Sequence, residues 1–467
     1  MYKERIDHYF KDKEALLIDG VCRLVSIDSV EGTPAPGAPF GPGPAAALDE
    51  ALRLAQEWGL ATTNHEGYVG TADLNDQPDA LHILGHLDVV APGEGWTITR
   101  PFRPLVSQGL IYGRGTDDDK GPMVAALLAM KAVRDLGIPL RANCKCILGT
   151  NEESGSADIA WYFARHPYAP ATFSPDSGFP VVNTEKGSLR PTFSQSWPVQ
   201  EQLPRVRWLR GGIRINVLPG DAAAAVEGIP AADMVSYARP ITARSGIKFS
   251  YTCEDGLTIV RARGEGSHAA WPEGGNNAIT GLVALLCALP LADGPCKEAL
   301  TRLNQLMPHG DCYGKALGIA QEEPVAGRLT LAFTLLTVTD TGLEGRFDSR
   351  VPLCATEENC LQVARAAFES RGFTFEGQQQ PAHHTPAESS FVQTLLKRYE
   401  QYSGLKGECL STGGGTYVHD IPGGVAFGCS LPGFESHLHG ADERVRISDL
   451  MLSARMFTHI ILDLCAQ

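Results

Sequence analysis

The sequence predicts an α/β fold in which a mostly parallel central sheet, flanked by helices, is interrupted by an inserted α+β domain. The first observation is the order strand, helix, strand over residues 79–150, where the strand-like segments are almost continuously apolar. Such strands are typical of parallel sheets covered by helices on both faces. The second observation is a β-rich region between residues 187 and 383. The third is the return of a buried strand pattern at residues 423–433.

Local patterns predict the individual elements. After an amphipathic amino-terminal helix, a Pro/Gly-rich loop covers residues 31–46, and a helical pattern follows at 47–59. "ALHILGHLDVV" and "NCKCILGT" predict strands, whereas "GPMVAALLAMKAVRDLG" between them has helical spacing. We therefore expect a first domain from residues 1–186 and 384–467, with 187–383 as the insertion.

Composition narrows the class of protein. The chain has 467 residues, of which 43% are hydrophobic and 20% charged, as in ordinary soluble globular proteins. A formal net charge of −14 argues against nucleic acid as a partner, because phosphate binding needs a basic surface. There is neither a signal-like segment nor an apolar run of about 18 residues, so we expect no membrane association. Twelve scattered cysteines favour reduced thiols and a cytoplasmic location.

Polar side chains follow or interrupt the apolar strands. These residues are His86, Asp88, Asp117, Asp118, Asp119, Glu152, Glu153, Asp176, His437 and His439. In open α/β sheets the carboxyl ends of the strands line the ligand crevice, so we expect these side chains to converge. Histidine and carboxylate together suit zinc or a similar divalent ion.

Each of these signals is weak by itself. A histidine in an apolar strand is more often a hydrogen-bonded core residue, and a Glu-Glu pair is usually a solvated helix start. Three adjacent aspartates ordinarily form an exposed turn or complement a helix dipole. The conjunction of five segments favours a metal site, because otherwise each segment needs its own separate explanation.

Several motifs also carry a family resemblance. "HLDVV", "GRGTDDDKGP", "TNEESG", "SPDSGFP" and "HGADE" resemble, in order and spacing, the motifs of the di-metal exopeptidase family that includes aminoacylase-1 and carboxypeptidase G. Aspartate in "SPDSGFP", together with "GGIRINVLPG", "GEGSHAAWPEGGNNA", "FDSRVP" and "STGGGTYV", is similar to the PepV/Sapep-type bacterial dipeptidases within that family. The resemblance covers nearly the whole chain.

The resemblance implies a site for two divalent metal ions. By this resemblance His86 and Asp176 bind one ion, Glu153 and His439 bind the other, and Asp118 bridges both. Asp117 and Asp119 remain alternatives to Asp118, and His437 remains the competitor of His439. We expect zinc, and manganese or cobalt would also fit this donor set.

The resemblance also implies a mechanism. Two ions hold a water between them and lower its pKa, and Glu152 acts as the general base that moves the proton to the leaving amine. Asp88 orients His86 by accepting its second N–H. His268 in the insertion stabilises the oxyanion.

The substrate's carboxylate is expected to bind to residues of the insertion and the glycine-rich loop. These are Asn216, Arg350 and the backbone amides of Gly414 and Gly415. The long insertion resembles a doubled lid that supplies His268 within the same chain. We therefore expect an active monomer.

The predicted function is hydrolysis of unblocked dipeptides, small-molecule substrates, with β-alanyl and Xaa-His dipeptides as further candidates. The alternative is an N-acyl amino acid deacylase with the same metal chemistry. A binding protein on an inactive peptidase scaffold is disfavoured by the intact Glu152. A phosphate-binding role for "GRGTDDDKG" is disfavoured by its three aspartates and by the absence of P-loop spacing.

Overall fold

The computed structural model describes residues 2–466, which form two compact units. Unit 1 contains the described residues up to Thr184, the segment His384–Ser411, and the described residues from Gly415 onward. Unit 2 contains Glu185–His383 and the short segment Thr412–Gly414. The sequence did not predict that this glycine-rich segment groups with the insertion.

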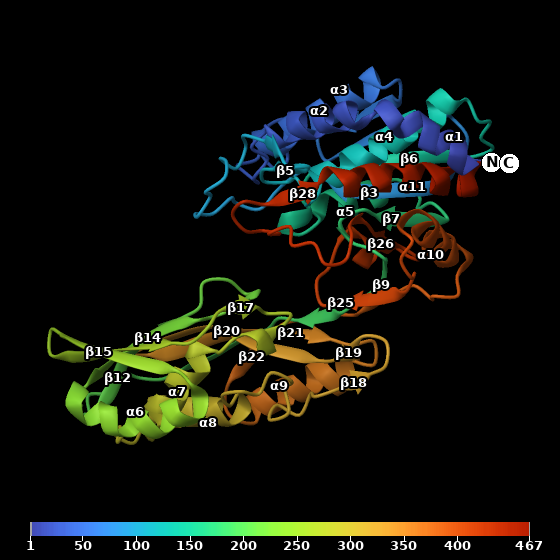
Figure 1. The fold of residues 1–467 in the computed structure, drawn as a ribbon. Helices are drawn as coiled ribbons and strands as arrows, with labels where there is room; N and C mark the ends of the chain where they lie inside the picture. Colours follow the sequence, from blue (N-terminus) through green and yellow to red (C-terminus); the bar gives the residue numbers. More distant parts are fainter. Residues whose placement is uncertain (1, 467) are drawn as a thin grey trace. The chain divides into compact units, whose positions relative to one another are not determined.

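Unit 1 is built on a nine-stranded sheet that is parallel at its centre (Figure 1). The parallel strands are β6 (Asn143–Gly149), β3 (Asp79–His86), β7 (Ala171–Ser174) and β26 (Val425–Phe427), in that spatial order. They lie where the apolar segments predicted buried strands. Their carboxyl ends meet at one edge of the sheet, which positions the polar residues that follow them.

The expectation of a mostly parallel sheet needs correction, because antiparallel strands flank the centre. β1 (Ala61–His65) and β2 (Val69–Asp73) pair antiparallel with each other, and β2 pairs antiparallel with β6. A tight turn with positive φ at Glu66 and Gly67 joins β1 to β2, and such a short connection permits only antiparallel pairing. β9 (Val181–Glu185) is antiparallel to β26 on the other side, and β24 (His383–His384) and β25 (Cys409–Thr412) pair along β9.

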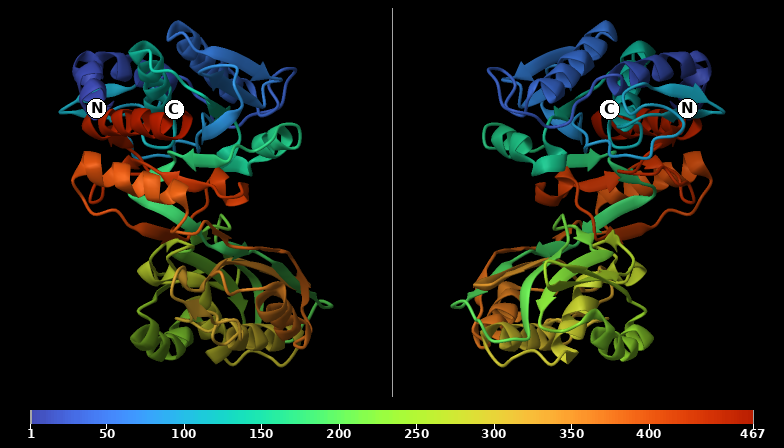
Figure 2. Two further views of the ribbon diagram at one scale, coloured as in Figure 1. Left: turned by 90° about the vertical axis from the view of Figure 1, so that its right-hand side faces the viewer. Right: turned by 90° about the vertical axis from the view of Figure 1, so that its left-hand side faces the viewer.

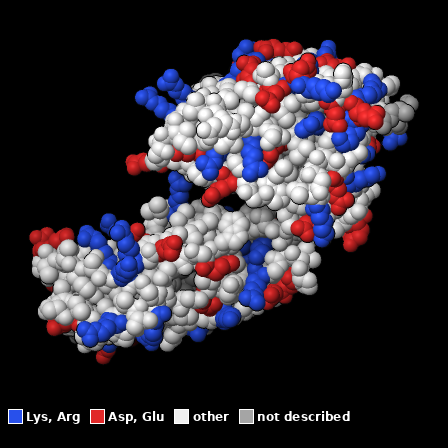
Figure 3. Space-filling view, viewed as in Figure 1, with Lys and Arg blue, Asp and Glu red and all other residues white. Residues whose placement is uncertain are grey.

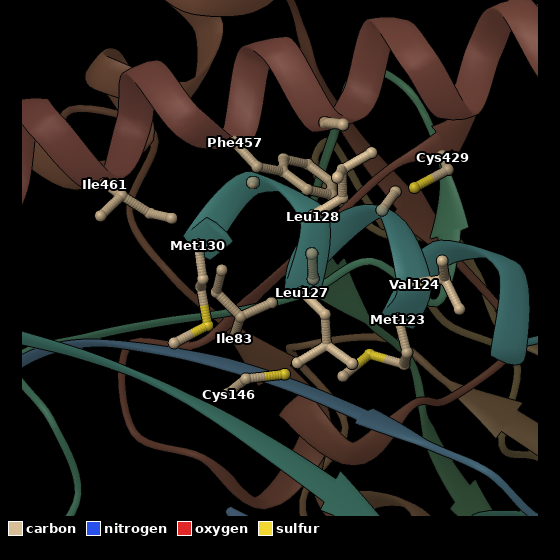
Figure 4. Packing of buried hydrophobic residues seen from close by; sticks show 14 of the residues in the cluster. Ile83, Met123, Val124, Leu127, Leu128, Met130, Cys146, Cys429, Phe457 and Ile461 are labelled. Carbon is tan, nitrogen blue, oxygen red and sulfur yellow. The ribbon is translucent and has the colours of Figure 1, made fainter. Parts of the chain in front are cut away.

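Helices cover the sheet of unit 1. They are α1 (Tyr2–Tyr9), α2 (Glu14–Val25), α3 (Pro42–Glu57), α4 (Lys120–Leu136), α5 (Ala157–Phe163), α10 (Ser390–Ser403) and α11 (Ile447–Cys465). α4 and α11 pack against each other although more than 300 residues separate them (Figure 1). Figure 4 shows Leu127 of α4, Phe457 of α11, Ile83 of β3 and Cys146 of β6 in one buried cluster. This packing fixes β3 and the start of α4, which both carry site residues.

Three smaller features of unit 1 matter for the site. β4 (Leu105–Ser107), β5 (Leu110–Tyr112) and β28 (Arg444–Arg446) form a three-stranded sheet. β8 (Ser177–Gly178) pairs with β27 (Cys429–Ser430). A 3₁₀ helix, η2 (Glu152–Ser154), directly follows the turn after β6.

Unit 2 contains a ten-stranded sheet whose neighbouring strands pair antiparallel. Its strands are β10 (Gly187–Leu189), β11 (Thr192–Ser196), β12 (Arg205–Gly211), β14 (Asp221–Glu227), β15 (Lys248–Glu254), β16 (Leu257–Arg263), β20 (Thr330–Thr339), β21 (Gly342–Val351), β22 (Thr374–Glu376) and β23 (Gln379–Gln380). β20 and β21 form a long antiparallel hairpin within the region that was predicted to be β-rich.

Helices lie on one face of the unit 2 sheet, as Figures 1 and 2 show. These helices are α6 (Ala231–Ser245), α7 (Ala278–Ala288), α8 (Pro295–Leu306) and α9 (Gln362–Glu369). Ile279 and Leu282 of α7 and Phe368 of α9 belong to one buried cluster with the sheet. The insertion is therefore an α+β layer with its own hydrophobic core.

On the face drawn in Figure 3, basic side chains are interspersed with acidic ones. Over residues 2–466, none of the helices has both the length and the apolar character needed to span a membrane.

Candidate metal centre

The polar residues predicted to converge in unit 1 lie at the carboxyl ends of the parallel strands. His86 is the last residue of β3, Asp176 follows β7, and Glu153 lies in η2 after β6. Asp118 lies in the turn before α4, and His439 lies in the loop before β28. These five side chains form two groups whose donor atoms lie within 4.8 Å of one another in each group.

The first group contains His86, Asp118 and Asp176. Nε2 of His86 lies 2.9 Å from Oδ1 of Asp118 and 3.6 Å from Oδ2 of Asp176. His86 is fully buried, and the two carboxylates are nearly so. One imidazole nitrogen and two carboxylate oxygens are therefore directed at one point.

The second group contains Asp118, Glu153 and His439. Nε2 of His439 lies 2.8 Å from Oδ2 of Asp118 and 3.2 Å from Oε1 of Glu153. Asp118 thus offers one carboxylate oxygen to each group, as a bridging ligand does. His439 is the most accessible of the five, with 47% of its side chain exposed.

The surroundings of His86 indicate that positive charge belongs at this point. Its Nδ1 lies 3.0 Å from the carbonyl oxygen of Asp88, which can only accept, so Nδ1 carries the proton in the neutral ring. Its buried Nε2 then directs a lone pair at two carboxylates, and it has no hydrogen-bond partner among the described residues. Burial lowers the pKa of His86, but interactions with the carboxylates of Asp118, Asp176 and Asp88 outweigh it and raise this pKa well above its ordinary value. The carboxylates therefore favour positive charge at this point, either a proton on Nε2 or a metal ion. The donors present therefore fit a divalent metal ion.

The pKa values of the ligands support the same conclusion. Burial and then repulsion from Asp118 raise the pKa values of both Glu153 and Asp176. Burial alone would lower the pKa of His439, but hydrogen bonds to Asp118 and Glu153 outweigh it and raise this pKa to about 11. The cluster holds excess negative charge that positive charge would stabilise.

Glu152 stands beside the ligand Glu153 and is partly buried. Burial, followed by repulsion from Asp176 and Glu153, raises its pKa well above the ordinary value, although His86 acts in the opposite direction. A carboxylate with a raised pKa near a metal centre is a stronger base than one in water.

Asp88 contacts His86, as the prediction that it orients the ring requires, but mainly through its backbone. Its carboxylate is 3.4 Å from Nδ1 of His86, whereas its backbone carbonyl is closer, at 3.0 Å. Each carboxylate oxygen of Asp88 instead accepts a 3.1 Å hydrogen bond from a backbone amide, Oδ1 from Glu152 and Oδ2 from Glu153. Asp88 therefore fixes the general-base candidate and its neighbouring ligand together, in addition to holding the histidine ring.

Sequence reasoning missed Asp158 and Tyr417, which hold the same turn from its other side. Oδ2 of the buried Asp158 accepts hydrogen bonds from the amides of Thr150 (2.6 Å) and Asn151 (3.0 Å), and from the hydroxyl of Tyr417. The ring of Tyr417 packs edge-on against His86 at 6.1 Å. The sequence shows only an acidic residue near the start of a short helix, which is common and not specific, and the partners of Asp158 are distant in sequence.

The alternative ligands occupy other positions. Asp117 accepts a 2.6 Å hydrogen bond from Ser430, and Asp119 accepts one of 3.1 Å from the amide of His86. Oδ2 of Asp119 lies so near Gly85 that a Cβ there would be 2.1 Å away, which explains the glycine in "ILGHLDVV". His437 contacts the carbonyl of Ala441 at 3.2 Å. Asp117, Asp119 and His437 therefore belong to neither of the two candidate metal groups.

Unit 2 brings Asn216 and His268 together. A two-stranded sheet pairs β13 (Val217–Leu218) with β17 (Ser267–His268), so that Val217 lies opposite His268. The carbonyl of Asn216 accepts a 2.9 Å hydrogen bond from the amide of Ala269. Nδ1 of His268 accepts one of 3.2 Å from the amide of Ala270, which fixes the ring.

Arg350 lies close to the same part of unit 2. It is paired with Thr330, whose hydroxyl contacts the carbonyl of Ala270 at 3.3 Å. Asp348 binds its guanidinium in a fork, at 2.9 Å to Nε and 3.0 Å to Nη2, and Nη1 donates to the carbonyl of Gly413. These bonds leave one N–H on each terminal nitrogen of Arg350.

The glycine-rich loop is partly engaged within the protein itself. The amide of Gly414 donates a 3.1 Å hydrogen bond to Oγ1 of Thr412, so this N–H is already used in the structure. Gly415 is the first residue of the last segment of unit 1, whereas Gly413 and Gly414 group with unit 2.

Two carboxylate-bridged metal groups at the carboxyl ends of parallel strands, with a basic glutamate beside them, are the features of a dinuclear metallohydrolase. The sequence matches the peptidase family M20/M25/M40 over residues 82–463. The chain belongs to this family and is a metallopeptidase.

Curated relatives align along nearly the whole chain. "Putative dipeptidase YtjP" of Bacillus subtilis (strain 168) is 34% identical over 464 residues, covering 97% of this chain and 98% of the relative. The Beta-Ala-Xaa dipeptidase of Lactobacillus delbrueckii subsp. lactis is 31% identical over 458 residues, covering 97% of this chain and 96% of the relative.

Solved structures share the fold at low identity. Human carnosine dipeptidase 1 has a TM-score of 0.58 at 14% identity, covering 99% of both chains. The aminoacylhistidine dipeptidase from Vibrio alginolyticus has a TM-score of 0.59 at 13% identity, covering 97% of both chains. These likenesses concern the fold alone.

Proposed function

We propose that this protein is a metal-dependent dipeptidase that hydrolyses the single peptide bond of unblocked dipeptides with two divalent ions. The observation that carries the proposal is the pair of metal groups that share Asp118, with Glu152 adjacent to the ligand Glu153. The names of the two relatives above 30% identity, both dipeptidases, support this substrate class.

In this proposal His86 and Asp176 hold one ion, Glu153 and His439 hold the other, and Asp118 bridges them. When bound, the ions polarise the scissile carbonyl and make water acidic enough to attack near neutral pH. Glu152 takes the proton of the attacking water and delivers it to the leaving amine. Asp88 keeps Glu152 within reach of this water, because its carboxylate accepts a hydrogen bond from the backbone amide of Glu152. Base catalysis of this kind typically contributes about 10²–10⁴ in rate.

Residues of unit 2 are proposed to bind the scissile carbonyl and the carboxylate of the substrate. His268 donates a hydrogen bond to the oxyanion that forms at the scissile carbonyl, and Arg350 binds the substrate's carboxylate with its two remaining N–H groups. Asn216 adds a side-chain donor, and the loop around Gly414 and Gly415 completes the carboxylate site. A doubled lid that supplies His268 in the same chain makes a single chain sufficient for activity.

The substrate range and the metal are further parts of the proposal. The Beta-Ala-Xaa dipeptidase relative supports β-alanyl dipeptides as substrates beside α-dipeptides and Xaa-His dipeptides. Zinc suits the two histidines and three carboxylates, and manganese and cobalt suit the same donors.

A reconstitution panel tests the proposal. Metal-free protein is loaded separately with zinc, manganese and cobalt, and each form is assayed on Ala-Ala, β-Ala-His, Ala-Ala-Ala and N-acetyl-alanine. We expect both dipeptides to be cleaved with far higher kcat/KM than the tripeptide or the acetylated amino acid. Preference for N-acetyl-alanine would instead identify a deacylase. No hydrolysis with any metal would contradict the proposal as a whole.

A further inference from the structure

A buried ion pair in unit 1 connects the two loops that carry Asp118 and His439. Arg114 and Glu443 are 1% and 0% exposed, and Nη1 of Arg114 donates to Oε2 of Glu443. We propose that this pair is a positioning device, which holds the bridging carboxylate and the accessible histidine of the second metal group in ligating geometry before a metal binds. The proposal rests on the two-metal site of the proposed function and adds residues outside the ligand set.

Glu443 organises the loop of the bridging ligand. Its Oε1 accepts hydrogen bonds from the amides of Gly115 and Asp117, each at 3.0 Å, and of Asp118 at 3.4 Å. Its backbone carbonyl also accepts a 2.9 Å bond from the amide of Gly113. One side chain therefore accepts hydrogen bonds from several backbone N–H groups of the turn that contains Asp118. Backbone N–H groups arranged in this way form an anion-binding concavity, which the carboxylate of Glu443 fills.

Arg114 organises the loop of the second histidine. Its Nη2 donates to the carbonyls of His439 and Gly440, both at 3.1 Å. His439 has a φ of 58°, in the left-handed region that few residues other than glycine adopt. Such a conformation persists only where surrounding contacts hold it. Because the side chain of His439 is also half exposed, these carbonyl bonds are the buried anchor of this ligand.

The distribution of these contacts argues against a general stabilising role. The loops around Asp118 and His439 are more than 300 residues apart in sequence, and the hydrogen bonds of the pair run mainly to them. Two bonds of Arg114 are exceptions, one from its side chain to the carbonyl of Pro92 at 3.4 Å and one from its backbone amide to the carbonyl of Pro101 at 2.8 Å. Ligand-supporting residues of this kind typically change metal affinity by about 10–100-fold when they are altered.

Calorimetric titration of the metal-free chain with zinc provides the test. The unmutated protein is expected to bind two ions. Arg114→Lys keeps the charge but loses the planar fork, so we expect one site to weaken by about 10–100-fold while the other keeps its affinity. His439→Ala should weaken the same site, and adding Arg114→Lys to His439→Ala should then change little further.

The matched control is Arg398→Lys. Arg398 also binds a carboxylate in a fork, with Asp463 at 2.5 and 2.7 Å, but this pair joins α10 and α11. We expect both metal affinities of the control to equal those of the unmutated protein. Equal zinc affinities in Arg114→Lys and the unmutated protein would overturn the inference. Fewer than two ions bound by the unmutated protein would instead overturn the two-metal proposal.

Hydrogen exchange of the unmutated, metal-free chain tests the inference without any variant. Since Glu443 already binds the amides of Gly115 and Asp117, we expect the segment 113–119 to exchange slowly before zinc is added. Fast exchange there, with protection only after zinc binds, would show that the metal and not the ion pair organises the loop. Glu443→Gln should accelerate this exchange if the inference holds.

Discussion

Asp118 and His86 form a contact that requires positive charge between the two side chains. Nε2 of His86 lies 2.9 Å from Oδ1 of Asp118, although the bond of Nδ1 to the carbonyl of Asp88 leaves Nε2 without a proton in the neutral ring. An unprotonated nitrogen and a carboxylate oxygen at this distance repel each other unless a positive charge lies between them. Although burial lowers the pKa of His86, interactions with the carboxylates of Asp118, Asp176 and Asp88 raise it well above its ordinary value, so this positive charge comes from a ring proton in the metal-free protein. A metal ion that both atoms ligate supplies it in the proposed two-metal site.

The first prediction concerns the bridging ligand. Asn at position 118 retains only one oxygen, so Asp118→Asn cannot supply both metal groups, and we expect fewer than two tightly bound ions with at least a 10²-fold loss of kcat/KM. Metal analysis after dialysis measures the bound ions. The control variant, Asp76→Asn, changes an exposed aspartate of unit 1 and should keep both metal ions. Two tightly bound ions in Asp118→Asn would exclude the bridging role.

The second prediction concerns the general base. Glu152→Gln removes the basic oxygen but leaves the five ligands unchanged, so kcat should fall by about 10²–10⁴ while two metal ions remain bound. Steady-state kinetics and metal analysis on the same preparation separate the two effects. If kcat stays within a factor of a few of the unmutated value, Glu152 is not the base.

The third prediction concerns the carboxylate site of unit 2. Asp348 is fully buried and binds Arg350 through both oxygens, so Asp348→Asn should loosen the guanidinium. Losing a charge-assisted bond costs about 1–2 kcal/mol, which predicts roughly a 5–30-fold rise in KM for Ala-Ala with a smaller change in kcat. Ala-Ala-amide, which has no carboxylate, serves as the comparison substrate. An equal effect of Asp348→Asn on both substrates would contradict this role for Arg350.

The fourth prediction concerns subunit independence. If one chain supplies both Glu152 and His268 to a substrate, mixing Glu152→Ala with His268→Ala should leave the mixture inactive. Activity that recovers on mixing, and increases with protein concentration, would show that the two residues come from different chains. Size-exclusion chromatography with light scattering on the same mixtures measures the oligomeric state.

The fifth prediction concerns stability and pH. Burial, followed by the charge of Arg398, lowers the pKa of His459 on α11 to about 4, below the value of about 6.5 in an unfolded chain. Between these values the unfolded chain binds a proton that the folded protein does not, so stability falls as the pH decreases from about 6.5 to 4. His459→Gln should lose less stability over this window, as measured by urea unfolding at pH 7 and pH 5. An identical loss in both proteins would assign the pH dependence to other groups.

The sequence predicted the central features of unit 1 because they depend on local patterns. Apolar runs located β3, β6, β7 and β26, and His86 and Asp176 follow such runs directly. Convergence of the site residues then follows from the parallel order of these strands. The flanking antiparallel strands were missed, although the Glu66-Gly67 turn between two short β segments was a usable signal.

Partners that are distant in sequence could not be predicted. The carboxylate of Asp88 binds amides that lie 64 and 65 residues further along the chain, and nothing near Asp88 specifies them. The bond of Tyr417 to Asp158 and that of Arg114 to Glu443 join segments even further apart. Motifs identified the candidate ligands, whereas the residues that hold these side chains in place depend on tertiary packing.

The most direct test of the two-metal account is stepwise reconstitution of the metal-free protein with zinc, with Ala-Ala hydrolysis measured after each addition. We expect negligible activity without metal and maximal activity at two ions per chain, since Asp118 belongs to both candidate metal groups. Full hydrolysis of Ala-Ala by protein that metal analysis shows to be free of divalent ions would contradict the two-metal account.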